Sequence, residues 1–403
     1  MTGVPLRRVA RTVSGAGFPH EHQGVEFGEY PFFKVGDFAS PGNERYLTYC
    51  NNWVSATTAR FLGARPVPAG SILLPKVGAA LLGNARRICT TWSVFDNNVL
   101  AIIPTHIESR YIHYWLSTID LGELANPGPV PSINEGPICE LLMPEIGITM
   151  GKQIADYLDT ETACLEALIS KKQRMVSLMD EWFSASIGIL LQKSGVEDVP
   201  VKRLVSKIGS GSTPRGGSEV YVEKEEGITF LRSQNVRKGL VDHTDIVYIT
   251  HQADKDLLRT RLRKRDVLLN ITGGSIGRTA VVSEEDLPAN VSQHVCILRP
   301  LLDVDPYLLQ ASLETTSVQD QIDLCQVGGN REGLNFDQVG SLRVKIPRGD
   351  NGVGTRKRLD ALRKRRDALV AVLTRQIELL QERRQALITA AVTGQLDIPE
   401  VVA

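Results

Sequence analysis

Clusters of arginine, asparagine and glutamine in short glycine-containing loops are the clearest chemical signal in this 403-residue chain. In the second half, Arg232–Asn235 follows one β-like run and Asn270–Arg278 follows the next. Arginine, asparagine and glutamine can each bond the edge of a nucleic-acid base through two hydrogen bonds, whereas serine, threonine, lysine and glycine amides suit phosphates. The clusters therefore predict a nucleic-acid interface. Any one of these residues alone is equally well explained as a solvated loop residue or a buried polar group.

The candidate contacts fall into two sets, one in each half of the chain. In the first half they are Lys34, Asp37, Lys76, Asn84, Arg86, Arg87, Asn97 and Asn98. In the second half they are Ser210, Ser212, Thr213, Arg215, Arg232, Ser233, Gln234, Asn235, Arg237, Lys238, Asn270, Thr272, Ser275, Arg278, Gln293, His294, Asn330 and Arg331. The segment Gly209–Pro214 could form a nest of backbone amides for a phosphate or a flexible turn before a strand, and its motif leaves both open.

Signatures of an enzyme are missing from the sequence. It contains no Gly-x-x-x-x-Gly-Lys-Ser/Thr phosphate loop, no Gly-x-Ser-x-Gly elbow and no helix with paired histidines. His20 and His22 lie close together, but without a third ligand nearby they are better explained as surface residues than as a metal site. We therefore predict neither a catalytic residue nor a metal site.

Length and composition predict a multidomain globular protein. A chain of 403 residues exceeds one ordinary core, so two or three domains are expected. With 46 basic and 46 acidic residues, a nucleic-acid surface must be built from locally segregated charge. The 6 cysteines are scattered, as in a reducing compartment, and we find neither an export signal nor a membrane-length apolar run. These features lead us to expect a cytoplasmic protein without a membrane partner.

Two long, highly charged segments predict a pair of helices. Residues 355–392 carry leucine and isoleucine at heptad-like spacing, and residues 154–187 repeat the pattern. A narrow apolar seam is typical of a helix packed against one other helix, and Gly394 is placed to end the second one. The predicted pairing residues are Leu158, Leu165, Leu168, Met175, Met179, Trp182, Leu362, Leu369, Leu373, Ile377, Leu380 and Leu387.

The chain has the organisation of a tandem repeat, in which a globular domain and then a helix occur twice. Phe33–Phe38 corresponds to Leu231–Val236, and Ile72–Gly78 corresponds to Val267–Gly273. This order predicts an α/β (α+β) protein with two similar domains separated by two long antiparallel helices, as an internal pseudo-two-fold repeat. The predicted boundaries are 1–145 for the first domain, 146–192 for the first helix, 193–347 for the second domain, and 348–403 for the second helix and tail.

Several ordered motifs resemble one known family. In the second half they are Gly227–Val236, Asp266–Arg278, Ala289–His294, Gly329–Phe336 and the ending Glu382–Asp397. In the first half they are Gly17–Pro19, Pro31–Asp37, Pro75–Ala80 and Asp96–Val99. Together they cover nearly the whole chain and resemble the DNA-specificity subunit of type I restriction–modification systems. The motifs of the first half look like one of that family's target-recognition domains.

The resemblance implies a function and a set of partners. Each globular domain would read one half of a bipartite target in double-stranded DNA. The helices would set the spacing between the domains and hold methyltransferase subunits, two of which are expected. The chain itself would be non-catalytic and hold no cofactor. S-adenosylmethionine would lie on the adenine-specific methyltransferase subunits, and ATP and magnesium on a restriction (translocase–nuclease) subunit, in a complex for phage defence.

Two other classes of protein stay open at this point. An enzyme in its own right would transfer methyl groups as the purified chain. A coiled-coil adaptor without DNA readout would show no salt-sensitive, sequence-selective binding to duplex DNA, even with a methyltransferase partner present.

Overall fold

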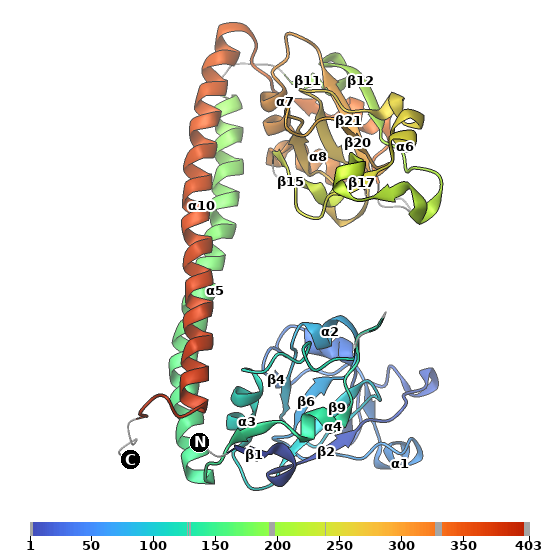
Figure 1. Ribbon diagram of the computed structural model, residues 1–403. Coiled ribbons are helices and arrows are strands. Elements are labelled where there is room, and N and C mark those ends of the chain that lie inside the picture. Colours follow the sequence, from blue (N-terminus) through green and yellow to red (C-terminus); the bar gives the residue numbers. More distant parts are fainter. Residues whose placement is uncertain are drawn as a thin grey trace. The chain divides into compact units, whose positions relative to one another are not determined.

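The computed structural model describes residues 3–126, 128, 130–192, 198–237, 239–326 and 333–398. The candidate contacts Lys238, Asn330 and Arg331 lie outside these ranges. The chain forms two compact units: unit 1 comprises residues 1–172 and 376–403, and unit 2 comprises residues 173–375. Each unit contains one α/β domain and one part of each long helix, α5 (Ile148–Gln192) and α10 (Gly349–Val392) (Figure 1). The predicted mixed α/β class is confirmed.

The first α/β domain (residues 3–144) is built on a sheet with the strand order β2-β9-β6-β7-β4, beside which a smaller sheet has the order β5-β3-β8. Every residue of β6 is buried, as expected for a strand covered on both faces. The strands are β1 (Gly3–Pro5), β2 (Ala10–Ser14), β3 (Tyr30–Phe33), β4 (Tyr46–Leu47), β5 (Trp53–Val54), β6 (Ile72–Pro75), β7 (Arg87–Cys89), β8 (Val94–Phe95), β9 (Val99–Pro104) and β10 (Leu142–Pro144). The helices are α1 (Ala56–Phe61), α2 (Gly78–Leu82), α3 (Ser109–Leu116) and α4 (Glu135–Cys139).

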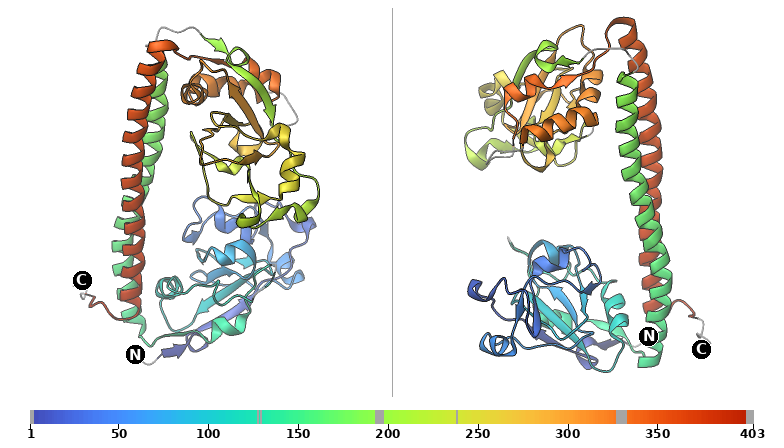
Figure 2. Two further views of the ribbon diagram at one scale, coloured as in Figure 1. Left: turned by 45° about the horizontal axis from the view of Figure 1, so that its top comes forward. Right: turned by 180° about the vertical axis from the view of Figure 1, so that it is seen from behind.

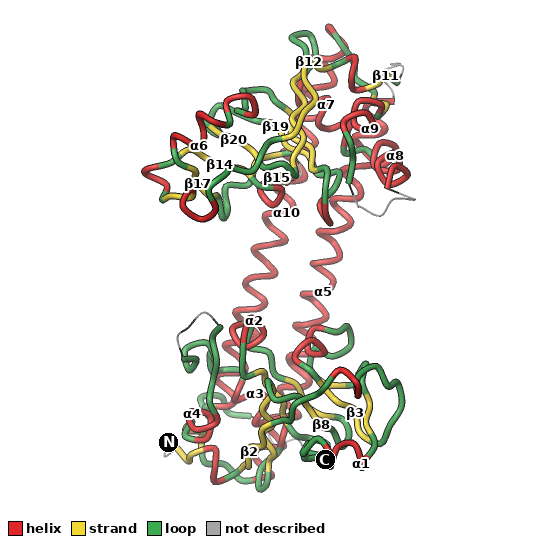
Figure 3. Tube along the Cα trace, turned by 90° about the vertical axis from the view of Figure 1, so that its right-hand side faces the viewer, coloured by secondary structure: helices red, strands yellow, loops and turns green. Residues whose placement is uncertain are grey.

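The second α/β domain (residues 199–344) has the corresponding sheets, β12-β21-β18-β19 and β13-β17-β14-β20 (Figure 3). Its strands are β11 (Val199–Pro200), β12 (Val205–Ser210), β13 (Tyr221–Val222), β14 (Ile228–Leu231), β15 (Val236–Arg237), β16 (Leu240–Val241), β17 (Val247–Ile249), β18 (Val267–Asn270), β19 (Thr279–Val281), β20 (Ala289–Val291), β21 (Val295–Pro300) and β22 (Arg343–Val344). Its helices are α6 (His251–Asp256), α7 (Pro306–Leu313), α8 (Thr316–Gln326) and α9 (Phe336–Ser341).

Corresponding glycines show how closely the two domains match. Gly78 and Gly273 follow β6 and β18, with φ values of +74° and +73°, a left-handed conformation that favours glycine. At Gly15 and Gly211, which follow β2 and β12, a Cβ atom would lie only 1.9 and 1.7 Å from the carbonyl oxygen of a facing segment. The predicted internal repeat is therefore confirmed down to single backbone positions.

Helices α5 and α10 pair with each other and complete the core of each domain. In unit 1, Ile154 and Leu158 of α5 and Ile388 of α10 are buried in one apolar cluster with α3. In unit 2, Ile187 of α5 and Leu359 of α10 are buried in a cluster with α7. In each unit the first part of one helix therefore lies beside the last part of the other (Figures 1 and 2). The pair is antiparallel, as predicted.

The ends of α10 were predicted with unequal success. Gly394, with a φ of +71°, follows its C-terminal end as predicted. The helix begins at Gly349 and not near residue 355. Its first turns include Gly349, Gly352 and Gly354, which the sequence pattern had placed before the helix. At Gly352 a Cβ atom would lie 2.8 Å from the carbonyl oxygen of Pro347, so this glycine permits a close approach that the sequence pattern did not reveal.

The apolar seam between the helices is narrower than the heptad pattern predicted. Leu158, Leu165 and Leu373 are buried, and Met179, Leu362, Ile377, Leu380 and Leu387 are half-buried. Leu168, Met175, Trp182 and Leu369 are 41%, 45%, 39% and 41% exposed, so these predicted pairing residues lie outside the buried centre of the seam. A straight α-helix drifts by about 20° per heptad from a 3.5-residue repeat, so such a pattern does not stay on one face of a long helix.

Candidate nucleic-acid interface

Loops that are far apart in the sequence meet at one edge of the sheets in the second α/β domain. β14 and β20 run parallel and end together, and the Ser292 amide donates to the Leu231 carbonyl at 2.9 Å. β18 ends beside the start of β21, where the Ile271 amide donates to the His294 carbonyl at 3.0 Å. We define the second loop cluster as residues 210–215, 232–237, 271–278 and 292–294.

The first α/β domain brings the corresponding loops together in the same way. The Asp96 amide donates to the Phe33 carbonyl at 3.0 Å, where β3 and β8 end in parallel. The Lys76 amide donates to the Asn98 carbonyl at 2.7 Å, at the end of β6 and the start of β9. We define the first loop cluster as residues 14–18, 34–37, 76–78 and 96–98.

Most of the predicted contacts reach the surface of these two clusters. The exposed members are Asn97 in the first cluster and Ser212, Thr213, Arg215, Gln234, Arg237, Arg278, Gln293 and His294 in the second. The half-buried members are Lys34, Lys76, Asn98, Ser210, Arg232, Ser233, Thr272 and Ser275. Some are already oriented: Thr272 Oγ1 lies 2.6 Å from His294 Nδ1, and the Arg237 guanidinium pairs with Asp242 at 2.9 Å. Each cluster thus presents hydrogen-bonding groups of the kinds that suit base edges and phosphates.

Three of the predicted contacts are buried and hold the loops instead. Asn235 is fully buried, accepts a 3.0 Å hydrogen bond from the Arg232 amide, and donates to two backbone carbonyls at 3.0 and 2.9 Å. Asn270 is also fully buried and donates to the Ser233 carbonyl at 2.8 Å. Asp37 is 5% exposed and accepts a 2.7 Å hydrogen bond from the backbone three residues earlier. In this structure these side chains are not available to DNA.

Three more predicted contacts form hydrogen bonds within the first α/β domain: Asn84, Arg86 and Arg87. Arg86 is 6% exposed and donates to the Ile119 carbonyl at 2.9 Å, and burial lowers its pKa to about 10. Arg87 donates to the Phe38 carbonyl at 2.8 Å. The Asn84 side chain accepts a hydrogen bond from a backbone amide at 2.7 Å. These three residues were predicted to contact DNA, whereas the polar partners they have in the structure belong to the chain itself.

The segment Gly209–Pro214 does not form an open nest of amides at its centre. The Gly211 amide donates to the Val295 carbonyl and the Ser212 amide donates to the Val291 carbonyl, both at 3.1 Å. These two N–H groups are therefore used by the sheet. The side chains of Ser212 and Thr213 remain exposed and keep their capacity to bond phosphates.

Asp37 and Asn235 occupy corresponding positions in the two domains. We expect Asp37→Asn and Asn235→Asp to have opposite effects on the free energy of unfolding. Burial raises the pKa of Asp37, so its ionised form opposes folding above the ordinary carboxyl range. Asp37→Asn should therefore stabilise the chain by roughly 0.5–2 kcal/mol at pH 7. The gain should shrink as the pH falls towards 4, because protonated Asp37 no longer opposes folding.

The reverse exchange, Asn235→Asp, serves as the matched control. It would aim a carboxylate at the carbonyls of Asp242 and Thr244 and should cost about 2 kcal/mol or more at pH 7. Urea unfolding of the full chain between pH 4 and 7 measures both. A loss of stability in Asp37→Asn at pH 7 would contradict the argument.

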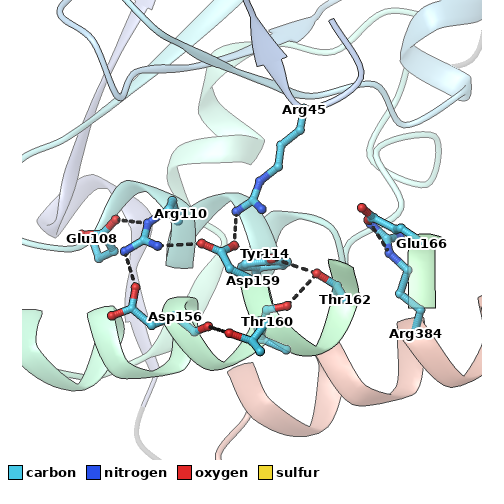
Figure 4. A network of polar contacts seen from close by, with 11 residues as sticks. Arg45, Glu108, Arg110, Tyr114, Asp156, Asp159, Thr160, Thr162, Glu166 and Arg384 are labelled. Atoms are coloured by element: carbon cyan, nitrogen blue, oxygen red, sulfur yellow. Dashed lines mark hydrogen bonds and ion pairs between the residues drawn. The ribbon is translucent and has the colours of Figure 1, made fainter. Parts of the chain in front are cut away.

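A polar network that the sequence did not single out fixes the first α/β domain on helix α5 (Figure 4). Arg110 of α3 contacts Asp156 and Asp159 of α5 at 2.8 and 2.6 Å. Tyr114 donates to Asp159 at 2.7 Å, and Arg45 adds an ion pair to the same carboxylate at 2.7 Å. Burial alone would raise the pKa of Asp159, but the bonds from Tyr114, Arg45 and Arg110 more than offset it, so the pKa is lowered. The sequence signal that could have revealed this network is the pair Asp156 and Asp159, which lie three residues apart on the face of α5 that enters the core.

Metal ions and membranes have no evident site in the described parts of the chain. Among those residues, no three His, Cys, Asp or Glu side chains come together in a group that could hold a metal ion. The helices in the same ranges include none with the length and apolar character needed to cross a membrane.

Comparisons with known proteins point to one class. No family model matches the chain. The type I restriction enzyme StySPI specificity subunit of Salmonella potsdam is 22% identical over 204 residues, 50% of this chain and 43% of that protein. The EcoBI specificity subunit of Escherichia coli is 23% identical over 173 residues, 43% of this chain and 36% of that protein. The chain therefore matches less than half of the length of either relative.

One solved structure extends the likeness of the fold to nearly the whole chain. A chain from a structure titled as the basis of complex assembly and conformational transition of the type I R-M system aligns with a TM-score of 0.57 and 14% identity, over 98% of both chains. The HsdS subunit of Thermoanaerobacter tengcongensis aligns over 98% of this chain and 97% of its own, at 14% identity and a TM-score of 0.41.

The fold and the paired loop clusters define a class of protein with two similar α/β domains on an antiparallel helix pair. Over nearly its whole length the chain shares this fold with a protein of a type I restriction–modification system. The curated relatives are specificity subunits, which confirms the resemblance predicted from the sequence motifs.

Proposed function

We propose that this chain is the DNA-specificity subunit of a type I restriction–modification complex, in which each loop cluster reads one half of a bipartite target. The observation that carries the proposal is the pair of corresponding loop clusters. Both gather exposed or half-buried groups of the base- and phosphate-binding kinds at corresponding ends of corresponding strands. The similarity to specificity subunits supports the same assignment.

The proposal divides the work between this chain and its partners. The chain is non-catalytic, and its helices dock two methyltransferase subunits and set the gap between the two half-sites. The methyltransferase subunits carry S-adenosylmethionine and methylate adenine, and a restriction subunit carries ATP and magnesium. The complex acts on DNA in the cytoplasm.

A coiled-coil adaptor without DNA readout is the competing function. It accounts for the helix pair but gives no role to exposed Gln234, Arg278 and Gln293 at one sheet edge. It also does not follow from the similarity to specificity subunits, so it is not favoured.

Sequencing of methylated sites tests the proposal directly. Cells that express the chain with the methyltransferase subunit of its system should carry methylated adenine in one bipartite motif, and the purified chain alone should methylate nothing. An exchange of residues 1–145 for the corresponding domain of another specificity subunit should then change one half of the motif only. Loss of both halves in a folded, active hybrid would contradict independent reading.

A single arginine in the second loop cluster provides a finer prediction. Arg278→Ala should weaken binding to the cognate duplex by about 1–3 kcal/mol and relax one half-site if Arg278 contacts a base edge. Arg203→Ala is the matched control, because Arg203 is also exposed but lies before the start of β12, at the opposite end of that strand from the second loop cluster. Binding to randomised duplexes at fixed salt measures both. Equal effects of the two substitutions would remove Arg278 from the interface.

A further inference from the structure

The two α/β domains sit on their helices at corresponding positions. Leu158 of α5 and Leu359 of α10 are 0% and 1% exposed and enter the cores of the first and second domain. This correspondence aligns Thr162 of α5 with Arg363 of α10. We define the first junction as the contact of the first α/β domain with α5, shown in Figure 4, and the second junction as the contact of the second α/β domain with α10.

The second junction is built from different chemistry than the first. Arg356 of α10 pairs with Asp305 at 3.2 Å, and its guanidinium lies 3.7 Å from the ring centre of Tyr307. Arg363 of α10 donates to the side-chain oxygen of Gln310. Gln310 is fully buried, so the position of this pair is fixed by the core of the domain.

The two junctions have opposite electrostatic polarity. In the first junction Arg45 and Arg110 belong to the domain, and the carboxylates of Asp156 and Asp159 belong to the helix. Glu108 of the domain is a further partner of Arg110, at 2.8 Å. In the second junction Arg356 and Arg363 belong to the helix and Asp305 belongs to the domain. The helix also carries one acid, Asp360, at the position of Asp159, and it pairs with Arg356 at 2.8 Å. Beside it, the buried carboxyl of Glu314 lies within the influence of Arg363, and burial raises its pKa. Each domain therefore carries the charge that complements its own helix.

We propose that this opposite polarity keys each α/β domain to the first part of its own helix, so that the first domain fits the first part of α5 and is rejected by the first part of α10, and the second domain the reverse. A first domain on α10 would bring Arg110 against Lys357, which stands at the position of Asp156, with Arg356 and Arg363 at the positions of Ala155 and Thr162. Only Asp360 would take the place of Asp159. A second domain on α5 would leave Asp305 at Ala155 in place of Arg356, next to Asp156. Each crossed pairing removes ion pairs and brings like charges together at a half-buried contact, which disfavours it relative to the native pairing.

The keying excludes wrong pairings that the internal repeat otherwise invites. Two similar domains and two similar helices permit a domain to dock on the other helix, or on a helix of a second copy of the chain. Charge complementarity removes these alternatives without any change in the apolar core. The inference goes beyond DNA reading, because it concerns the junctions and not the loop clusters.

The first test places a charge of the α10 type on α5. Asp156→Lys introduces the residue that α10 carries at the corresponding position, Lys357, and Asp156→Gln is the neutral control of similar size. The side chain of Asp156 is 45% exposed, so both fit. Hydrogen exchange of α3 in the full chain at low salt should be about tenfold faster in the Lys variant than in the Gln variant. Exchange of α7 should not change, and high salt should shrink the difference.

The second test reverses the charge at the other junction. Arg356→Glu should speed the exchange of α7 about tenfold over Arg356→Gln and leave α3 unchanged. When Arg110 is also replaced by Gln, the difference in the α3 exchange rate between Asp156→Lys and Asp156→Gln should become smaller, because the facing cation is gone. The proposal is overturned if charged and neutral variants protect their helices equally at low salt, or if the Arg110 background leaves the difference undiminished.

Discussion

Replacing Gly211 by alanine is expected to abolish recognition by the second loop cluster and to leave the first intact. The new Cβ atom would lie 1.7 Å from the Val291 carbonyl oxygen, far inside any ordinary contact. The obstacle is backbone, so β12 must move away from β20 and break the hydrogen bonds that Gly211 and Ser212 donate. We expect a cost of about 3 kcal/mol in the second unit, at the upper end of overpacking effects. The loops that β12 helps to position should then lose their geometry.

The internal repeat supplies matched controls for this substitution. Gly15→Ala places a Cβ atom 1.9 Å from the Asp96 carbonyl oxygen and should disable the first loop cluster instead. Gly136→Ala and Gly188→Ala meet nothing within 4 Å, lie in helices outside both loop clusters, and should preserve both. Selection of bound duplexes from a randomised pool, with the methyltransferase subunit present, should show one half-site lost in each disabled variant. If Gly211→Ala and Gly15→Ala erase the same half-site, the loop clusters do not read separate halves.

The fold was predictable because its signals are local and occur twice. Short apolar runs bounded by glycine and proline define strands such as β6 and β18, and the positive φ of Gly78 and Gly273 explains why glycine stands in both places. The charged heptad-like segments gave the two helices. A single weak motif would not have sufficed, but the same order in both halves made each landmark support the others.

The direction of individual side chains was not predictable in the same way. Arg86 and Arg278 are the same residue type in corresponding halves, yet one is buried against a backbone carbonyl and the other is exposed. Whether a loop side chain turns inward depends on which backbone groups the fold leaves unpaired, and only the folded chain decides that. The junction in Figure 4 was not predictable from the sequence either, because Arg45, Arg110 and Asp159 are far apart along the chain and only the fold brings them together.

Lengthening both helices by one heptad is expected to move the two half-sites of the proposed target apart without changing either half. Lys172 of α5 lies against Gln376 of α10 at 2.6 Å, so insertions after Lys172 and after Arg375 fall at the same level of the pair. Seven residues add about 10 Å of helix, close to the length of three base pairs. The seam is restored after a heptad, so both junctions and both loop clusters should remain intact. The methylated motif should keep its halves and gain about three base pairs in the gap. Methylation should also be slower, because three base pairs rotate the second half-site by about 100° around the duplex.

A two-residue insertion at the same two positions separates the effect of length from that of packing. It adds only about 3 Å but turns the following seam by roughly 200°, which places charged side chains where leucine and isoleucine paired. We expect this variant to melt at a lower temperature and to methylate poorly, whereas the heptad variant should melt close to the parent chain. Circular dichroism and methylation sequencing distinguish the two. If the heptad variant methylates the original motif with its original gap, the helices dock the partner subunits but do not set the spacing, because a ruler that is longer by seven residues cannot leave the measured distance unchanged.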